Sequence, residues 1–327
     1  MIIIKSKESS IMVKKIMKTL SPLLLCGLLV IGCRNGERIP YFVLVPKALT
    51  NPYWLQVQDG MKEAAERLKV KAEMIGPVQA ADVSAQVQII ESLLSRRVDG
   101  IAVSPNDPDG VTAIIDQAAH MGIPVITFDS DAPKSKRLCY IGTNNYAAGR
   151  AAGRQLIKIA GRQGRHAILT GSLGALNLNE RIKGFQDELK AQAAEWQEVN
   201  LLFCDDATDR ALDQMEELTR ATPSLNAWFV CGGWAAVAGA ETFRNALNRR
   251  SDIVVISFDT VREELLLVKA GLVQALIGQR PHAMGVRCVE MLTHIVVDKK
   301  RPDQEIYDTG IDIVTRENVD RFLSQAK

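Results

Sequence analysis

Short runs of apolar and β-branched residues alternate with longer amphipathic segments from residue 41 onward. The short runs predict buried strands, and the longer segments, with apolar residues at helical spacing, predict helices that cover a sheet. In the first half of the chain the predicted strands are 41–45, 71–75, 101–103, 125–128 and 139–141, and the predicted helices are 53–68, 83–96, 109–121 and 146–159. In the second half the strands are 167–170, 199–203, 227–231, 253–258 and 273–277, and the helices are 179–191, 209–220, 235–248, 262–270 and 282–296. This alternation indicates an α/β fold in which parallel sheets have helices on both faces.

Two nearly identical hexapeptides lie 130 residues apart, VITFDS at 125–130 and VISFDT at 255–260. Each ends a predicted strand with an aspartate that is followed by a hydroxyl residue. We interpret the pair as a sign of two similar α/β lobes. Ligands of open parallel sheets bind beyond the carboxyl ends of the strands, so Asp129 and Asp259 are expected on opposite walls of one cleft, at its solvated edge. The alternative is that this sequence is only a common way to end a buried strand.

Composition and charge are those of a globular protein with room for two ordinary domains. The chain has 327 residues, of which 47% are hydrophobic and 24% are charged. Its net charge of +2 is uneven: residues 1–32 hold five lysines and one glutamate, a charge of +4, so the remainder carries −2. A nearly neutral body has no basic surface for nucleic acid, and we expect no such partner.

The N-terminal segment is typical of a secretory signal. Lysines precede an apolar run at 20–32 that is too short to span a bilayer comfortably, and a signal of ordinary length would begin at Met12. The run ends in LVIGC, which resembles the lipobox of bacterial lipoproteins. This resemblance implies cleavage after Gly32 and lipid on Cys33, with 33–39 as a polar tether. The alternative is an ordinary secretory signal with an incidental cysteine.

Four cysteines follow the signal, each in an apolar stretch and none at metal-ligand spacing: Cys139, Cys204, Cys231 and Cys288. We expect buried free thiols, with a disulfide between the second and third as the alternative. The four histidines are scattered, and no nucleophile lies near a base in a recognisable pattern. We therefore expect a protein that is not an enzyme and that has no metal or cofactor.

Six motifs occur in the order found in one known family. They are NPYW at 51–54, GIPVITFD at 122–129, YIGTNN at 140–145, ERIKGF at 180–185, VISFD at 255–259 and ALIGQ at 275–279. Over roughly 41–315 the chain thereby resembles the periplasmic sugar-binding proteins of ABC importers, of the ribose-binding type.

The resemblance implies a fold of two similar doubly wound parallel-sheet lobes joined by a three-segment hinge. It places the N-terminal lobe at 40–143 plus 280–308 and the C-terminal lobe at 144–279 plus 309–327. It also implies a monomer outside the cytoplasm, anchored by lipid, that closes around a small polar ligand. That ligand, expected to be a sugar, would be delivered to the membrane subunits of an ABC importer.

The resemblance also implies a ligand site. Asn51, Asp129, Asp259 and Gln279 would hydrogen-bond ligand hydroxyls, and Tyr53 and Trp54 would pack on the apolar face of a sugar ring. Trp234 lines the cleft or caps a helix that begins at 235. The candidate set is Asn51, Tyr53, Trp54, Asp129, Asn179, Trp234, Asp259 and Gln279, with Lys47, Ser130, Asn177 and Gly232 as further candidates.

Several positions depart from the ribose binders of the family. Ser130 and Asn179 stand where those proteins have arginine, Gly232 begins a Gly-Gly-Trp sequence where they have asparagine, and Lys47 replaces a small polar residue. The loss of two guanidinium groups and the gain of an indole favour a ligand shaped differently from ribose.

Two other functions are compatible with such a fold. A regulator of the lactose-repressor type would need an N-terminal helix-turn-helix and a basic face, where this chain has an apolar signal. A sensor that presents its closed lobes to a receptor would have the same sequence features as a transport protein, so that alternative stays open.

Overall fold

The computed structural model describes residues 38–326, and two six-stranded sheets organise this part of the chain. The segment proposed as signal and lipidation site, including Cys33, lies outside the described residues. No helix among the described residues is both long and apolar enough to cross a bilayer.

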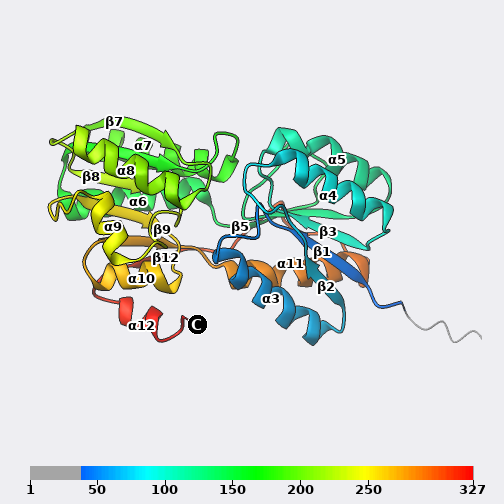
Figure 1. Ribbon diagram of the computed structural model, residues 1–327. Coiled ribbons are helices and arrows are strands. Elements are labelled where there is room, and N and C mark those ends of the chain that lie inside the picture. The colour runs from blue at the N-terminus through cyan, green and yellow to red at the C-terminus, as the bar shows by residue number, and fades with distance from the viewer. Residues whose placement is uncertain (1–37, 327) are drawn as a thin grey trace, which may run out of the picture. The chain divides into compact units, whose positions relative to one another are not determined.

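The first sheet has the strand order β11-β5-β4-β3-β1-β2, and its strand pairs are all parallel. Its strands are β1 (Tyr41–Val45), β2 (Lys71–Met74), β3 (Gly100–Val103), β4 (Val125–Phe128), β5 (Tyr140–Gly142) and β11 (Ile306–Asp308). Helices α4 (Val83–Ser95) and α5 (Pro108–His120) lie on one side of this sheet, and α3 (Tyr53–Leu68) and α11 (Pro281–Val296) lie on the other (Figure 1).

Strand β1 shows why the central strands are apolar throughout. Phe42 and Leu44 belong to the core cluster under α3 and α11, whereas Val43 and Val45 belong to the cluster under α4 and α5. All four side chains are fully buried. Successive side chains of a strand point to opposite faces, so a sheet covered on both sides needs apolar residues at every position.

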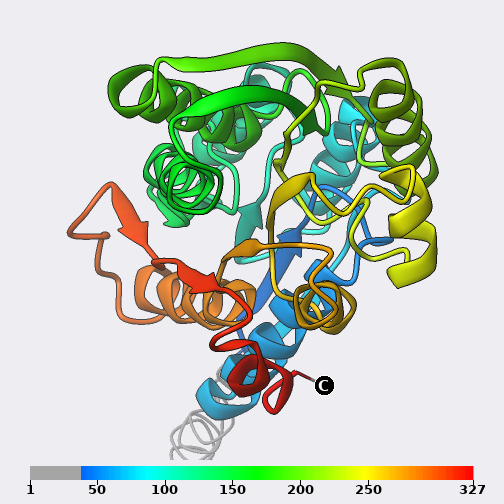
Figure 2. The ribbon, with the colours of Figure 1, turned by 90° about the vertical axis from the view of Figure 1, so that its left-hand side faces the viewer.

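The second sheet has the order β12-β10-β9-β8-β6-β7. Its strands are β6 (Gln163–Thr170), β7 (Glu195–Phe203), β8 (Ala227–Val230), β9 (Val254–Phe258), β10 (Ala275–Gly278) and β12 (Asp312–Val314), the last antiparallel to β10. The helices are α6 (Asn145–Ala160), α7 (Leu176–Gln192), α8 (Thr208–Ala221), α9 (Ala240–Ala246), α10 (Arg262–Lys269) and α12 (Val319–Leu323). In Figure 2 the sheet separates α6 and α7 from α8 and α9.

The two sheets repeat one topology, which confirms the predicted two-lobe α/β fold. If the strands of each lobe are numbered along the chain, strand 1 lies between strands 2 and 3 in the sheet, and strands 4 and 5 follow beyond strand 3. This is the order of a doubly wound fold. The chain passes between the sheets three times: between β5 and α6, between β10 and α11, and between β11 and β12. The sixth strands differ, because β11 runs parallel to β5 while β12 runs antiparallel to β10.

Most predicted elements are present, with two informative errors in their bounds. The helix predicted at 235–248 is wrong over its first five residues, which form turns; α9 begins only at Ala240, after Gly239 with a left-handed φ of 86°. Helix α7 begins at Leu176, three residues before the predicted start. The short elements β11, β12 and α12 were not predicted, because three to five residues are too few to show a period.

The four cysteines within the described residues are free and buried, as expected, and Cys204 and Cys231 do not pair. Burial raises the pKa of the Cys139 and Cys204 thiols to about 12, so neither is a ready nucleophile.

Candidate functional site

A cavity of about 60 Å³ lies between the two lobes, beyond the carboxyl ends of their central strands. It has room for roughly two water molecules, so a larger ligand enters only when the lobes or the lining side chains move. The lining residues come from both lobes: Lys47, Ala48, Thr50, Asn51, Tyr53, Trp54, Ala80, Asp129, Asn177, Leu178, Arg181, Asp206, Gly232, Gly233, Trp234, Asp259 and Gln279.

Asp129 and Asp259, the aspartates of the two hexapeptides, both line this cavity. Each directly follows the fourth strand of its lobe and has a left-handed backbone, with φ of 59° and 73°. Aspartate tolerates this conformation better than most residues. The expectation of a solvated edge is wrong, because the side chains are only 3% and 8% exposed. Neighbouring side chains cover them: Tyr53 and Ser104 contact Asp129, and Gln279 contacts Asp259.

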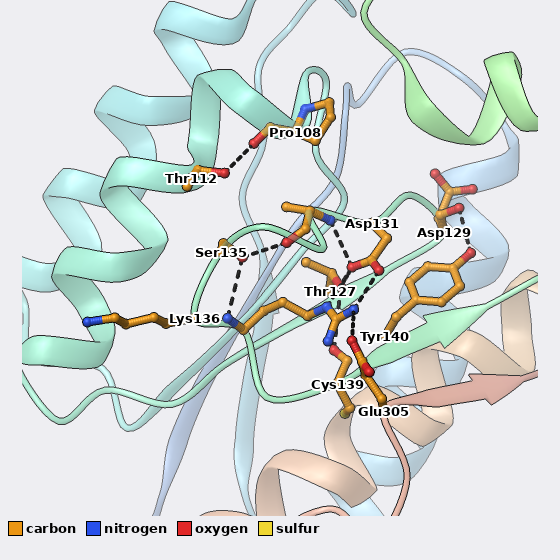
Figure 3. Close-up of polar contacts among 12 residues, drawn as sticks. Pro108, Thr112, Thr127, Asp129, Asp131, Ser135, Lys136, Cys139, Tyr140 and Glu305 are labelled. Carbon is orange, nitrogen blue, oxygen red and sulfur yellow. Dashed lines mark hydrogen bonds and ion pairs between the residues drawn. The ribbon is translucent and has the colours of Figure 1, made fainter.

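Hydrogen bonds from the first lobe fix the Asp129 carboxylate. Its Oδ1 accepts from the Tyr53 hydroxyl at 3.0 Å, and its Oδ2 accepts from the Ser104 hydroxyl at 2.8 Å. The Tyr140 hydroxyl donates to the Asp129 carbonyl oxygen at 3.0 Å, as Figure 3 shows. Asp131 and Arg137 form a bidentate pair that ties down the segment after Asp129. The carboxylate is therefore positioned before any ligand binds.

Asp259 is coupled to two of the segments that connect the lobes. Gln279 Nε2 donates to Asp259 Oδ1 at 2.7 Å, and Thr143 Oγ1 donates to Gln279 Oε1 at 3.1 Å. Gln279 lies between β10 and α11, and Thr143 lies between β5 and α6. Burial raises the pKa of Asp259, and the nearby Arg181 guanidinium opposes that rise. A ligand that binds Asp259 therefore contacts a side chain that is hydrogen-bonded to Gln279, in one of the segments that connect the lobes.

The NPYW motif supplies both a hydrogen bond at the start of α3 and aromatic surface. Asn51 Oδ1 accepts from the Tyr53 backbone N–H at 2.9 Å, at the start of α3. The Tyr53 and Trp54 rings meet edge to face with centroids 5.0 Å apart, and Trp54 meets Phe128 in the same way at 6.0 Å. Both aromatic residues line the cavity and are nearly buried. Asn51, Tyr53 and Trp54 thus lie where a ring-shaped ligand would contact them.

Lys47 is a buried cation on the first-lobe wall. Its Nζ donates to Asn177 Oδ1 at 2.7 Å, a hydrogen bond between the lobes. Burial lowers the pKa of Lys47, whereas Asp129 and Asp206 act to raise it. The carbonyl oxygen of Lys47 accepts from Asn106 Nδ2 at 3.0 Å, which fixes the backbone from which the side chain extends.

Arg181 is a site residue that sequence analysis missed. It is 2% exposed, and its Nε and Nη1 donate to Asn145 Oδ1 at 2.9 Å and to the Cys231 carbonyl at 2.8 Å. The guanidinium carbon lies 4.1 Å from the centroid of the Phe258 ring. Its Nη2 is buried without a hydrogen-bond partner among the described residues. A guanidinium is therefore present at the cavity, two residues beyond position 179, where the ribose binders have arginine and this chain has asparagine.

The early start of α7 explains why Asn179 does not line the cleft. Residues four apart share one face of a helix, so Asn177 and Arg181 both face the cavity. Asn179 lies on another face, is exposed, and donates to the Leu173 carbonyl at 2.9 Å. The structure therefore does not place Asn179 at the cavity. The ERIKGF motif contained the signal for Arg181, but a helix start at 179 placed it incorrectly.

Of the other candidate residues, some line the cavity and one does not. Trp234 and Gly232 line the cavity, and Trp234 caps no helix because α9 starts six residues later. Ser130 does not line the cavity; it is fully buried in the turn after β4, where its backbone N–H donates to the Phe128 carbonyl. Asp206, which sequence analysis also missed, follows β7 and lines the second-lobe wall.

A larger hollow of about 430 Å³ lies on the first lobe alone, near α3, α11 and β11. Its charged groups already have partners: Arg67 pairs with Glu290 at 2.6 Å, and His294 lies 3.3 Å from Asp298. The cavity between the lobes instead holds buried polar groups from both sheets, so we assign the functional site there.

Comparison with known proteins agrees with this geometry. Residues 42–300 match the family model described as periplasmic binding protein domain. The ribose import binding protein RbsB of Bacillus subtilis is 26% identical over 254 residues, covering 77% of this chain and 80% of RbsB.

Two solved structures extend the comparison. A solute-binding protein of an ABC transporter from Burkholderia graminis, in complex with D-arabinose, is 36% identical with a TM-score of 0.80, covering 85% of this chain and 96% of that protein. The XylFII–LytSN complex contains a chain that is 27% identical with a TM-score of 0.77, covering 85% and 98%. With its two doubly wound lobes and the cavity between them, the chain belongs to the periplasmic binding protein family.

Proposed function

We propose that this chain is an extracytoplasmic solute-binding protein that captures a neutral monosaccharide between its lobes and delivers it to an ABC importer. The preferred ligand class is an aldopentose or a similar sugar. The observation that carries the proposal is the placement of Asp129 and Asp259 at equivalent strand ends of the two lobes, on one cavity. Such a pair contacts hydroxyls from two sides at once.

The chemistry of the cavity fits a polyol. Carboxylates accept hydroxyl protons, while amide, ammonium and guanidinium groups donate to hydroxyl oxygens. Tyr53, Trp54 and Trp234 offer flat apolar surface to the C–H faces of a ring. The related protein with bound D-arabinose supports a pentose, and the relative named as a ribose import binding protein supports the same class.

Capture works by hinge closure. A ligand that contacts both lobes binds the closed arrangement more tightly than the open one, and this difference shifts the population towards closure. We assign the lobes to 40–143 plus 280–308 and to 144–279 plus 309–327. A monomer then presents one closed surface to the importer.

A calorimetric and thermal-shift screen tests this function. D-Arabinose, D-ribose, D-xylose, D-allose and D-galactose form the panel, with L-leucine and L-glutamate as controls. We expect at least one sugar to raise the melting temperature and to bind with a stoichiometry of one, because a ligand that binds only the folded state stabilises it by mass action. Binding of an amino acid with no response to any sugar would refute the assignment.

Sensing is the second candidate, because the similar chain XylFII is found in a complex with a second protein, LytSN. A sensor would present its closed lobes to a receptor protein and not to importer subunits. Deletion of the gene separates the two functions: loss of uptake of the radiolabelled sugar supports transport, whereas intact uptake with loss of sugar-dependent gene expression supports sensing.

A further inference from the structure

Asp206 lines the cavity, and one of its carboxylate oxygens is buried without a hydrogen-bond partner in the part of the chain that the structure describes. Its Oδ1 is inaccessible to solvent and has no hydrogen-bond partner among the described residues. The residue follows the edge strand β7 and has a left-handed backbone with φ of 59°. A Cβ added to Gly171 would lie only 1.8 Å from this oxygen. The carboxylate can occupy this position because the Asp206 backbone is left-handed and because Gly171 has no side chain.

Lys47 faces the same space from the other lobe. Both residues line the cavity, and each affects the charge of the other: Lys47 lowers the pKa of Asp206, and Asp206 raises the pKa of Lys47. Lys47 donates to Asn177 Oδ1, so the unpaired Asp206 oxygen is not satisfied by the lysine. A donor and an acceptor from opposite lobes therefore border one end of the cavity.

A buried acceptor without a hydrogen bond is unfavourable, and a ligand that donates to it removes that penalty. A hydroxyl suits this position because it can donate to a carboxylate while its oxygen accepts from an ammonium. An anionic group would meet two carboxylates, Asp206 and Asp129, beside the single Lys47 ammonium, so a sugar acid or sugar phosphate fits less well than a neutral hydroxyl.

We propose that Lys47 and Asp206 form a hydroxyl subsite, in which Asp206 Oδ1 accepts a ligand hydroxyl and Lys47 Nζ donates to a ligand oxygen. This inference rests on the proposed function and deepens it. Neither residue belongs to a hexapeptide, and both lie near enough to Asp129 for its charge to raise their pKa values. It selects neutral sugars that keep a hydroxyl at this end over analogues that lack it.

Titration calorimetry on Asp206→Asn and Lys47→Met tests the subsite. The probes are the panel sugar that binds the wild type most tightly and its monodeoxy analogues. In the wild type, removal of one particular hydroxyl should weaken binding about 10- to 100-fold, as for a hydrogen bond to a charged group. Asp206→Asn should bind the parent sugar more weakly than the wild type by a similar factor. In this variant, removal of that same hydroxyl should lower the affinity by less than about 3-fold.

Asp205→Asn is the matched control, because Asp205 is the adjacent residue but pairs with Arg210 at the surface. Its affinities should equal those of the wild type. Circular dichroism of each variant verifies the fold, and Lys47→Met gives an independent test from the other lobe. If the wild type binds a sugar but both variants keep its affinity and every deoxy penalty, the subsite is refuted. If the wild type binds no sugar, the proposed function itself fails.

Discussion

Lys47 of the first lobe donates a hydrogen bond to Asn177 of the second, with 2.7 Å between Nζ and Oδ1. Both side chains are buried, at 5% and 4% exposure. The bond therefore holds together two residues that separate whenever the lobes open. In the closed arrangement it gives the buried Lys47 ammonium a partner, without which its burial would be more unfavourable. This contact contributes to the stability of the closed arrangement independently of any bound ligand.

Asn177→Ala should shift the ligand-free protein towards the open arrangement. The variant removes the acceptor for Lys47 and leaves its ammonium without a partner in the closed cleft. Small-angle X-ray scattering should show a larger radius of gyration for the ligand-free variant than for the wild type. At saturating sugar the two values should converge.

Asn179→Ala is the control for this experiment, since Asn179 is exposed on the same helix and its side chain donates to the nearby Leu173 carbonyl. Equal radii for the two ligand-free variants would show that the Lys47–Asn177 bond does not affect closure.

Asp129→Asn and Asp259→Asn should each weaken sugar binding about 10- to 100-fold, the range expected for loss of a charge-assisted hydrogen bond. Asparagine suits the test better than alanine, because it tolerates the left-handed backbone at both positions. It also keeps an oxygen for Tyr53, Ser104 or Gln279, whose polar groups alanine would leave unpaired.

Calorimetry decides the outcome for both variants. Unchanged affinity in both variants would show that the repeated hexapeptide only ends a buried strand in each lobe and does not bind ligand. Loss in only one would place the ligand mainly against that lobe.

The repeated hexapeptide also shows what the sequence can reveal. Asp129 and Asp259 were predictable because a strand end has a fixed place in a doubly wound sheet. Their burial was not, because it depends on how far one lobe covers the other. Arg181 and Asp206 were missed for a related reason. The position of Arg181 at the cavity depends on where α7 begins, and that of Asp206 depends on its left-handed backbone after β7. Neither feature produces a periodic pattern of apolar residues that sequence analysis could detect.

Stability should depend on pH through Asp206. Burial raises its pKa from 3.8 to about 6; Lys47 opposes this shift, Asp129 and Asp205 add to it, and Arg181 opposes it. The folded state then binds a proton more tightly than the unfolded chain, so the wild type loses stability as pH rises from about 4 through 6. Asp206→Asn lacks this loss.

Urea denaturation at pH 4.5 and pH 7.5 measures the difference. Relative to Asp206→Asn, the wild type should be less stable at pH 7.5 than at pH 4.5, by at most about 3 kcal/mol. The exposed Asp205→Asn should keep this pH dependence in a slightly smaller form, because the Asp205 charge is only one of the smaller contributions to the raised pKa of Asp206. A difference that is independent of pH would contradict a raised pKa for Asp206.

Cys33→Ser should release the protein from membranes. The sequence LVIGC at 29–33 resembles a lipobox, and a serine cannot form the thioether that carries the lipid. Detergent partitioning and mass spectrometry of the mature N-terminus check this. Recovery of the wild type as a soluble protein with its signal cleaved elsewhere would refute lipidation.

Gly174→Ala should weaken sugar binding without destabilising either lobe. Gly174 lies in the segment between β6 and α7, and a Cβ at this position would lie 2.4 Å from Asp107 Oδ2 and 3.3 Å from Asp107 Cβ, across the cleft. The clash exists only when the lobes are in contact, so the variant should favour the open arrangement and lower affinity. Asp107→Ser should restore binding in the double variant, because serine is shorter and still caps α5, where Asp107 now accepts from the Gly110 N–H. Calorimetry on the two single variants and the double variant measures this coupling. If Asp107→Ser does not rescue Gly174→Ala, the loss of affinity has another cause than a steric block to closure.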